Sequence, residues 1–225
     1  MRSIMTNTEG TNPEVYLSLG LITSCKKSPG FPRILSLISS ILETTVENTE
    51  NKLDSLEITD TASVFTGMRA PTLSIRRYME RIFKYARCSP SCFLLGYIYI
   101  ERFLQQPDTY LTSLNVHRLI VTSVIVAAKF IDDAFCSNAY YARVGGINTL
   151  EMNTLELNFL ANLDFKLHVT VGTFDKYCSR IETEAKTYRI EPPIKTCAVD
   201  EWTNIEDPKH PAVVRRYSWV RITNL

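Results

Sequence analysis

The most apolar stretch of the chain covers residues 119–128, where no residue is charged and apolar side chains fall on every side of a helical wheel. A helix that is apolar all round is normally buried. A bilayer span needs roughly 20 apolar residues, so we expect this shorter stretch to be buried within protein. Its β-branched residues would also suit a central strand, but the length and the flanking Asn115 and Asp132 favour a helix over 115–133.

Apolar residues at helical spacing predict further helices on both sides of this central one. Before it, the pattern indicates an amphipathic helix from Pro32 that gives way to a polar connector over 47–60, followed by two more helices over 71–86 and 91–105. Pro71 and Pro90 are suited to first helical turns, where the missing N–H would be unpaired anyway.

After the central helix, residues 134–147 are expected to form a loop that ends in the turn at Gly145 and Gly146. A helix over 149–162 and a last amphipathic helix from Thr170 follow. The sequence therefore predicts an all-α protein, a five-helix bundle around a buried third helix, with an extra N-terminal helix and no sheet.

The chain of 225 residues, 45% of them hydrophobic, is long enough to bury one good core. We expect a flexible N-terminal arm over 1–30, rich in Thr, Asn, Gly and Pro, then an N-terminal helix and linker over 31–60. The helical domain covers 61–186, and an atypical, disordered tail covers 187–225.

Charge and cysteine usage exclude several classes of partner. The formal net charge is +1 and no long block of like charge occurs, which argues against a nucleic-acid partner, and no segment is suited to a membrane span. Six cysteines and three histidines are scattered without metal-ligand spacing, so we expect buried free thiols and no metal or cofactor. The lack of a glycosylation sequon and of a signal peptide favours an intracellular location, in the nucleus, the cytoplasm or both.

No motif of an active site stands out. The segment 144–147 lacks the glycine spacing and the Lys-Ser/Thr pair of a phosphate-binding loop. Ser, His and Asp occur, but not in the context of a nucleophile elbow. From the residues alone, the chain is an intracellular helical interaction domain and not an enzyme.

Several blocks of sequence resemble the cyclin box. They are M-R-A at 68–70, Y-I-Y-I-E-R-F at 97–103, A-A-K-F at 127–130 and L-E-L-N-F-L-A-N-L-D-F at 155–165. The blocks R-A-P-T-L-S-I, C-S-P-S-C-F, S-L-N-V-H-R-L, A-A-K-F-I-D-D and Y-Y-A-R-V-G-G-I are similar to plant U-type cyclins, also called P-type, which are related to the yeast phosphate-pathway cyclin. The helical domain over 61–186 would then be a single cyclin box.

The resemblance implies a regulatory subunit that binds and activates a cyclin-dependent protein kinase, with a link from cell division to phosphate status. Such a subunit presses on the C helix of the kinase and so completes the catalytic Lys–Glu pair inside its partner. Lys129 and Glu156 stand where cyclins place the pair that engages the kinase. Phe130, Phe165 and Leu167 match neighbouring contact positions.

Arg69 and Glu101 match the positions where cyclins bury an ion pair that joins their first two helices. Glu101 lies in the apolar run 97–103, where an unpaired carboxylate would be costly. The resemblance therefore predicts a structural ion pair between Arg69 and Glu101.

Two other functions compete with this hypothesis. A transcription-factor adaptor of the general-factor type uses the same helical fold, but usually with two copies of it and a basic face. One copy and a nearly neutral charge argue against that alternative. A metal-dependent enzyme would need ligands that this chain does not present.

Overall fold

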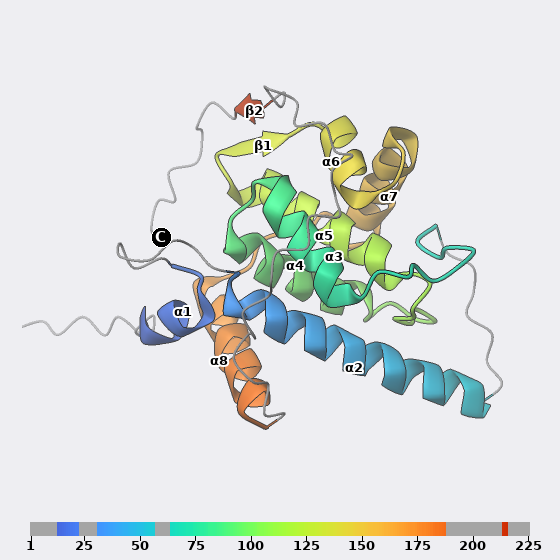
Figure 1. The fold of residues 1–225 in the computed structure, drawn as a ribbon, viewed down its shortest axis with the longest axis horizontal. Helices are drawn as coiled ribbons and strands as arrows, with labels where there is room; N and C mark the ends of the chain where they lie inside the picture. Colours follow the sequence, from blue (N-terminus) through green and yellow to red (C-terminus); the bar gives the residue numbers. More distant parts are fainter. Residues whose placement is uncertain (1–12, 23–30, 57–63, 188–212, 216–225) are drawn as a thin grey trace, which may run out of the picture.

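The computed structural model describes residues 13–22, 31–56, 64–187 and 213–215. Within these ranges the chain forms eight helices and two short strands (Figure 1). The helices are α1 (Pro13–Leu19), α2 (Arg33–Leu56), α3 (Ile75–Ala86), α4 (Pro90–Phe103), α5 (Val116–Ile131), α6 (Asn138–Gly145), α7 (Thr149–Asn162) and α8 (Val171–Thr187). The strands are β1 (Ala134–Cys136) and β2 (Val213–Arg215).

The predicted central helix is α5, and it is buried from Leu119 through Ala128. Two hydroxyls inside this run are satisfied by the helix itself, because Thr122 donates to the Arg118 carbonyl at 2.7 Å and Ser123 donates to the Ile120 carbonyl at 3.1 Å. Helix α4 crosses α5 closely at Gly96, where an added Cβ would lie 3.1 Å from Ser123 Oγ. The small residue thus permits the closest approach of the two buried helices.

The all-α class and the bundle around a buried third helix are confirmed, but the bundle includes a helix that the sequence did not predict. Residues 134–147, expected to be a loop, contain β1 and α6. The Ser137 side chain caps α6 by accepting from the Tyr140 N–H, and Gly146 ends it with a φ of 74°. The five predicted helices of the bundle correspond to α3, α4, α5, α7 and α8, and α6 packs against α3 and α7 in addition to them.

Local capping explains where the other predicted helices begin. Helix α3 starts at Ile75 and not at Pro71, because Ser74 accepts from the Arg77 N–H at 3.3 Å and supplies the N-cap. Helix α4 starts at Pro90, one residue before the predicted start of 91, with Ser89 at the N-cap position. Helix α7 covers the predicted 149–162, with Asn148 as its cap.

Helix α2 is longer than predicted. It continues to Leu56 through the segment expected to be a polar connector, because Val46 and Leu53 still turn a buried face toward the bundle. Glu50 also accepts from the Ser113 N–H at 2.7 Å, which ties this second half of α2 to the loop before α5.

The N-terminal arm was predicted to be flexible, but residues 13–19 form α1, which packs on α8. Leu19 is fully buried, the Tyr16 hydroxyl donates to Asp175, and Ser18 Oγ lies 3.0 Å from Glu182 Oε1. We call these contacts the α1–α8 clasp. The rest of the predicted arm, 1–12 and 23–30, lies outside the described residues.

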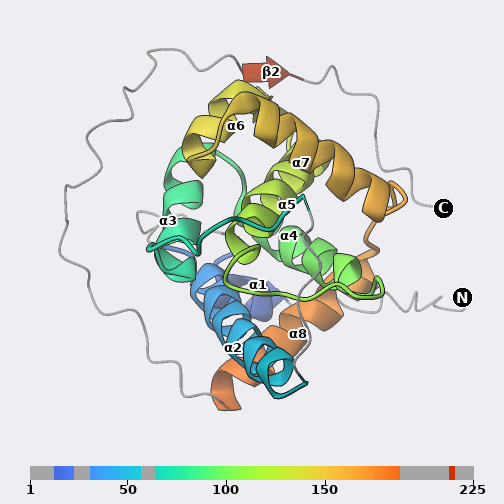
Figure 2. The same ribbon diagram turned by 90° about the vertical axis from the view of Figure 1, so that its right-hand side faces the viewer.

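The expectation of no sheet is wrong for one short ladder, in which β2 pairs antiparallel with β1. The tail prediction otherwise lies outside the described residues, as does the end of the predicted linker over 57–63. Figure 2 shows α1, α2 and α8 at one end of the molecule and α6 and α7 at the other. Across the described ranges, the model contains no helix with both the length and the apolar character of a membrane span.

Candidate functional site

The structure brings the predicted pair Lys129 and Glu156 together. Lys129 lies in the last turn of α5, and its ammonium Nζ is 2.6 Å from Glu156 Oε1 and 2.8 Å from Oε2 on α7. The two side chains are 22% and 18% exposed, so the pair is partly shielded from water but still reaches the surface. A cation at this position also offsets the negative end of the α5 dipole.

Asn138, the first residue of α6, completes this site. Its side-chain oxygen accepts from Lys129 Nζ at 2.6 Å, and its amide nitrogen donates to Glu156 Oε2 at 2.6 Å. The same nitrogen donates to Asn153 Oδ1 at 2.8 Å. One amide therefore holds the ammonium and the carboxylate in a fixed relation, and three helices meet at what we call the Lys129 network, made of Lys129, Asn138 and Glu156.

Sequence reasoning missed Asn138 because it placed residue 138 in a loop. The signal that could have located it is Ser137, a strong N-cap residue directly before it. The Lys129 network can act chemically as a preorganised donor and acceptor pair, since an ammonium donates and a carboxylate accepts.

Large apolar side chains are exposed at the end of α5, directly after Lys129, and past the end of α7. Phe130 and Ile131 are each 40% exposed at the end of α5. Phe165, past the end of α7, is 64% exposed. Exposed large apolar side chains are candidates for a binding surface.

The segment after α7 is held in an unusual conformation. Asp164 and Phe165 have φ values of 49° and 56°, in the left-handed region that bulky residues rarely occupy. The backbone beyond them is anchored to α4, since the Tyr99 hydroxyl donates to the Leu167 carbonyl at 2.8 Å and Arg102 donates to the Lys166 carbonyl at 2.8 Å. Leu167 itself is half-buried against the core, so the segment presents Phe165 outward and Leu167 inward.

The predicted ion pair between Arg69 and Glu101 does not form. Arg69 is exposed before α3, whereas the Glu101 carboxylate lies 2.5 Å from Arg180 on α8. Tyr97 and Tyr177 each donate a hydroxyl to the same carboxylate at 2.6 Å. Glu101 thus has the partners that its apolar surroundings require, but they come from a helix outside the predicted pairing.

The hydroxyls around Glu101 stay protonated. Burial and the neighbouring carboxylate both raise the pKa of Tyr97 and that of Tyr177 above the ordinary value for a phenol. Each hydroxyl therefore remains a donor to Glu101. The cluster is a structural contact between α4 and α8.

Four of the predicted buried free thiols are confirmed, namely Cys88, Cys92, Cys136 and Cys178. Cys25 and Cys197 lie outside the described residues. Within the described ranges, no group of three or more His, Cys, Asp or Glu side chains could hold a metal ion.

Comparison with known proteins decides the family. Residues 33–167 match the family model for cyclins, which spans α2 through the segment after α7. The chain belongs to the cyclin family. Within the family, the predicted likeness to plant U-type and P-type cyclins is confirmed by its relatives.

These relatives are similar over most of their length. Cyclin-P3-1 of Oryza sativa subsp. japonica is 53% identical over 197 residues, which cover 87% of this chain and 84% of that protein. Cyclin-U3-1 of Arabidopsis thaliana is 45% identical over 196 residues, 87% of this chain and 89% of the relative. Cyclin-U4-1 of the same plant is 50% identical over 153 residues, 68% and 76% of the two chains. This membership supports a regulatory and not a catalytic role.

Proposed function

We propose that this cyclin binds a cyclin-dependent protein kinase through the Lys129 network and activates it. The observation that carries the proposal is the shared, partly shielded arrangement of Lys129, Asn138 and Glu156, together with the exposure of Phe130, the next residue on α5, and of Phe165 past the end of α7. A docked segment of the kinase could accept from the ammonium through its backbone carbonyls and donate to the carboxylate through its N–H groups.

The apolar flanks supply the complementary part of this interface. Burying Phe130, Ile131 and Phe165 against the kinase would remove apolar surface from water, at roughly 25 cal/mol per Å². The polar pair at the centre would then fix the register of the docked segment. Pressure on the C helix of the kinase completes the catalytic Lys–Glu pair inside the partner, and the cyclin itself does no chemistry.

A transcription-factor adaptor is the second candidate from the sequence, and the Lys129 network does not favour it. An adaptor that binds nucleic acid needs an excess of Lys and Arg on one face. In the Lys129 network the single cation is paired with a carboxylate, so the site carries no net charge. The link to phosphate status and the location in the nucleus or cytoplasm stay predictions from the resemblance and the cysteine usage.

The test is a titration of purified cyclin-dependent kinases with the full chain, with binding and phosphorylation of a peptide substrate measured together. Lys129→Ala and Glu156→Ala should each weaken association at least about tenfold, since removing one partner of a desolvated polar contact costs roughly 2–5 kcal/mol. The matched control is Lys176→Ala, an exposed lysine on α8, which should bind like the parent. Unchanged binding in both network variants, with helical content intact by circular dichroism, would show that the assigned surface is wrong.

A further inference from the structure

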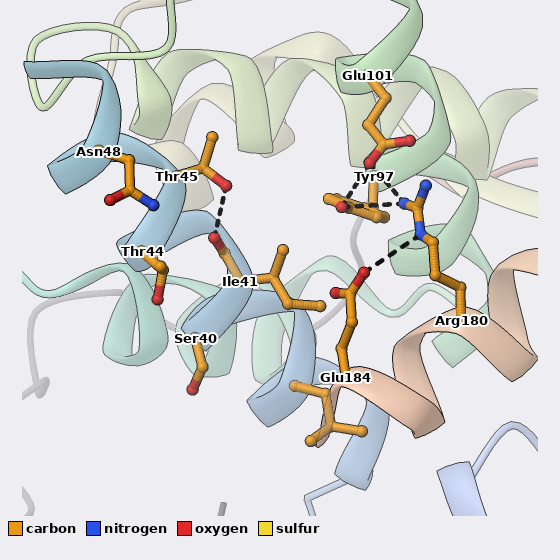
Figure 3. Close-up of a pocket in the computed structure, with 10 residues that line it drawn as sticks. Ser40, Ile41, Thr44, Thr45, Asn48, Tyr97, Glu101, Arg180 and Glu184 are labelled. Carbon is orange, nitrogen blue, oxygen red and sulfur yellow. Dashed lines mark hydrogen bonds and ion pairs between the residues drawn. The ribbon is translucent and has the colours of Figure 1, made fainter. Parts of the chain in front are cut away.

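A hollow of about 480 Å³ lies between α2, α4 and α8, on elements that contribute nothing to the Lys129 network (Figure 3). A second hollow of about 260 Å³ shares Thr45, Tyr97 and Glu101 with the first and continues toward Leu104 and Leu111. The two form one elongated depression along α2, which we call the α2 groove. The α2 groove contains no residue of the Lys129 network, so the proposed kinase binding does not account for it.

One wall of the α2 groove offers free hydrogen-bonding groups above an apolar floor. Leu37 and Ile41 contribute the floor, and Thr44 and Asn48 lie one helical turn apart along the rim. The Thr45 hydroxyl is already engaged, since it donates to the Ile41 carbonyl at 2.7 Å. Within the described part of the chain, the side chains of Thr44 and Asn48 make no hydrogen bond, so they are available to a ligand. An Asn amide both donates and accepts, which matches the two groups of a peptide unit.

The opposite wall carries an excess of negative charge. Glu101 and Glu184 face a single guanidinium, that of Arg180 (Figure 3). Glu101 is fully engaged, but Glu184 lies 3.7 Å from Arg180 Nε, beyond hydrogen-bond distance, and its side chain is 36% exposed. Its carboxylate can therefore accept from an incoming cation.

The net negative charge of α2 also favours a cationic ligand over an anionic one. From residue 43 to 54 the helix carries four carboxylates against Lys52 alone. An anionic ligand such as a phosphate would be repelled by this field, and Arg180 is already held by Glu101. A cationic ligand is attracted by it.

We infer that the α2 groove binds a short, extended, basic peptide segment of a partner protein. The wall from Leu37 to Asn48 is about 16 Å long at 1.5 Å per helical residue, the length of roughly five extended residues. The peptide backbone bonds to Thr44 and Asn48, one apolar side chain lies on Leu37 and Ile41, and a Lys or Arg side chain reaches Glu184. This inference goes beyond the proposed kinase binding and does not depend on it.

The experiment is selection of a random seven-residue phage-displayed library on the full chain, followed by fluorescence anisotropy with the enriched peptides. Lys and Arg should be enriched, and binding should weaken as salt is raised. Two variants address the groove separately: Thr44→Trp fills it, and Glu184→Arg reverses the charge of a partly exposed carboxylate whose contact with Arg180 is a long ion pair of 3.7 Å. Each should weaken binding at least tenfold while circular dichroism stays unchanged.

Matched controls keep the outcome decisive. Thr154→Trp places the same bulk on the exposed face of α7, and Glu80→Arg reverses a partly exposed carboxylate on α3 that, like Glu184, is paired with an arginine on its own helix. Both should bind within about twofold of the parent, as should Lys129→Ala. Failure to enrich basic peptides, or binding that survives both groove variants, would overturn the inference. Loss of binding in Lys129→Ala would also overturn it, because it would place the peptide on the Lys129 surface.

Discussion

Glu101 on α4 and Arg180 on α8 form an ion pair with Oε1 and Nη2 2.5 Å apart, so the carboxylate of the apolar run 97–103 is neutralised from a helix 79 residues further along the chain. Arg180 also stacks over the Tyr177 ring, with its guanidinium carbon 4.3 Å from the ring centroid. Helix α8, which follows the matched cyclin segment, is therefore bound into the core of this protein.

We expect Glu101→Leu to lower the free energy of unfolding by roughly 2–3 kcal/mol, because Tyr97, Tyr177 and Arg180 all lose their acceptor. Urea denaturation followed by circular dichroism measures the change. Arg69→Ala is the control and should lie within about 0.5 kcal/mol of the parent, since Arg69 is exposed. Equal destabilisation by the two variants would restore the pairing that the resemblance predicted.

The α1–α8 clasp gives a second prediction with a control on the same helix. Leu19→Ala should lower the free energy of unfolding by about 2–4 kcal/mol, because the Leu19 side chain is completely buried and its removal leaves a cavity. Leu17→Ala should be nearly neutral, since Leu17 is 49% exposed. Denaturant titration of the two variants side by side measures the difference. Equal midpoints would mean that α1 is not docked in solution.

Asn138 gives a prediction about the positioning of the Lys129 network. Asn138→Ala should weaken kinase association about three- to tenfold without changing the melting temperature, because it frees the ammonium and carboxylate that the amide aligns. Surface plasmon resonance against the kinase measures the change in affinity. Asn153→Ala is a suitable control, because Asn153 contacts Asn138 but neither charged group. If Asn138→Ala binds like the parent, the amide does not position the pair.

His117 gives a prediction about pH. Burial lowers the pKa of His117 below its ordinary 6.5, and Arg118 beside it lowers the pKa further, although the Leu73 carbonyl at 2.7 Å acts in the opposite direction. The folded state therefore resists protonation more than the unfolded chain does. Stability should be unaffected by this residue above pH 6.5 and should fall as the pH drops from 6.5 toward the lowered pKa.

The measurement is the free energy of unfolding between pH 7.5 and about 5, a window above the ordinary pKa of carboxylates. His117→Gln removes the titrating group and should flatten the slope in that window. An identical slope in the variant would assign the pH dependence to other residues.

The parts of the fold that the sequence predicted well are those that local patterns determine. Helix α5 has an apolar surface on every side, and Ser89 with Pro90 marks the start of α4 directly. Such signals need no knowledge of the rest of the chain. For the same reason the boundaries of α7 were correctly predicted.

The parts that were missed depend on contacts with distant segments. Helix α1 is only seven residues long and is stabilised by α8. The second half of α2 looks polar because, among its side chains that the structure describes, only Val46 and Leu53 are buried. In the site, Lys129 and Glu156 were named from the resemblance, but Asn138 was hidden in a presumed loop. The partner of Glu101 was misassigned, since no local pattern points from residue 101 to residue 180.

The α1–α8 clasp also fixes the order in which parts of the chain can fold during its synthesis. Ser18 and Glu182 are 164 residues apart in the chain, so at a synthesis rate of 5–20 residues per second α1 is made roughly 8–33 s before the surface it packs against. During that interval Leu19 has no α8 to bury against, whereas α3 to α7 can assemble as they emerge. The clasp closes last, and nascent chains stalled before residue 171 should leave α1 open to chaperones and proteases.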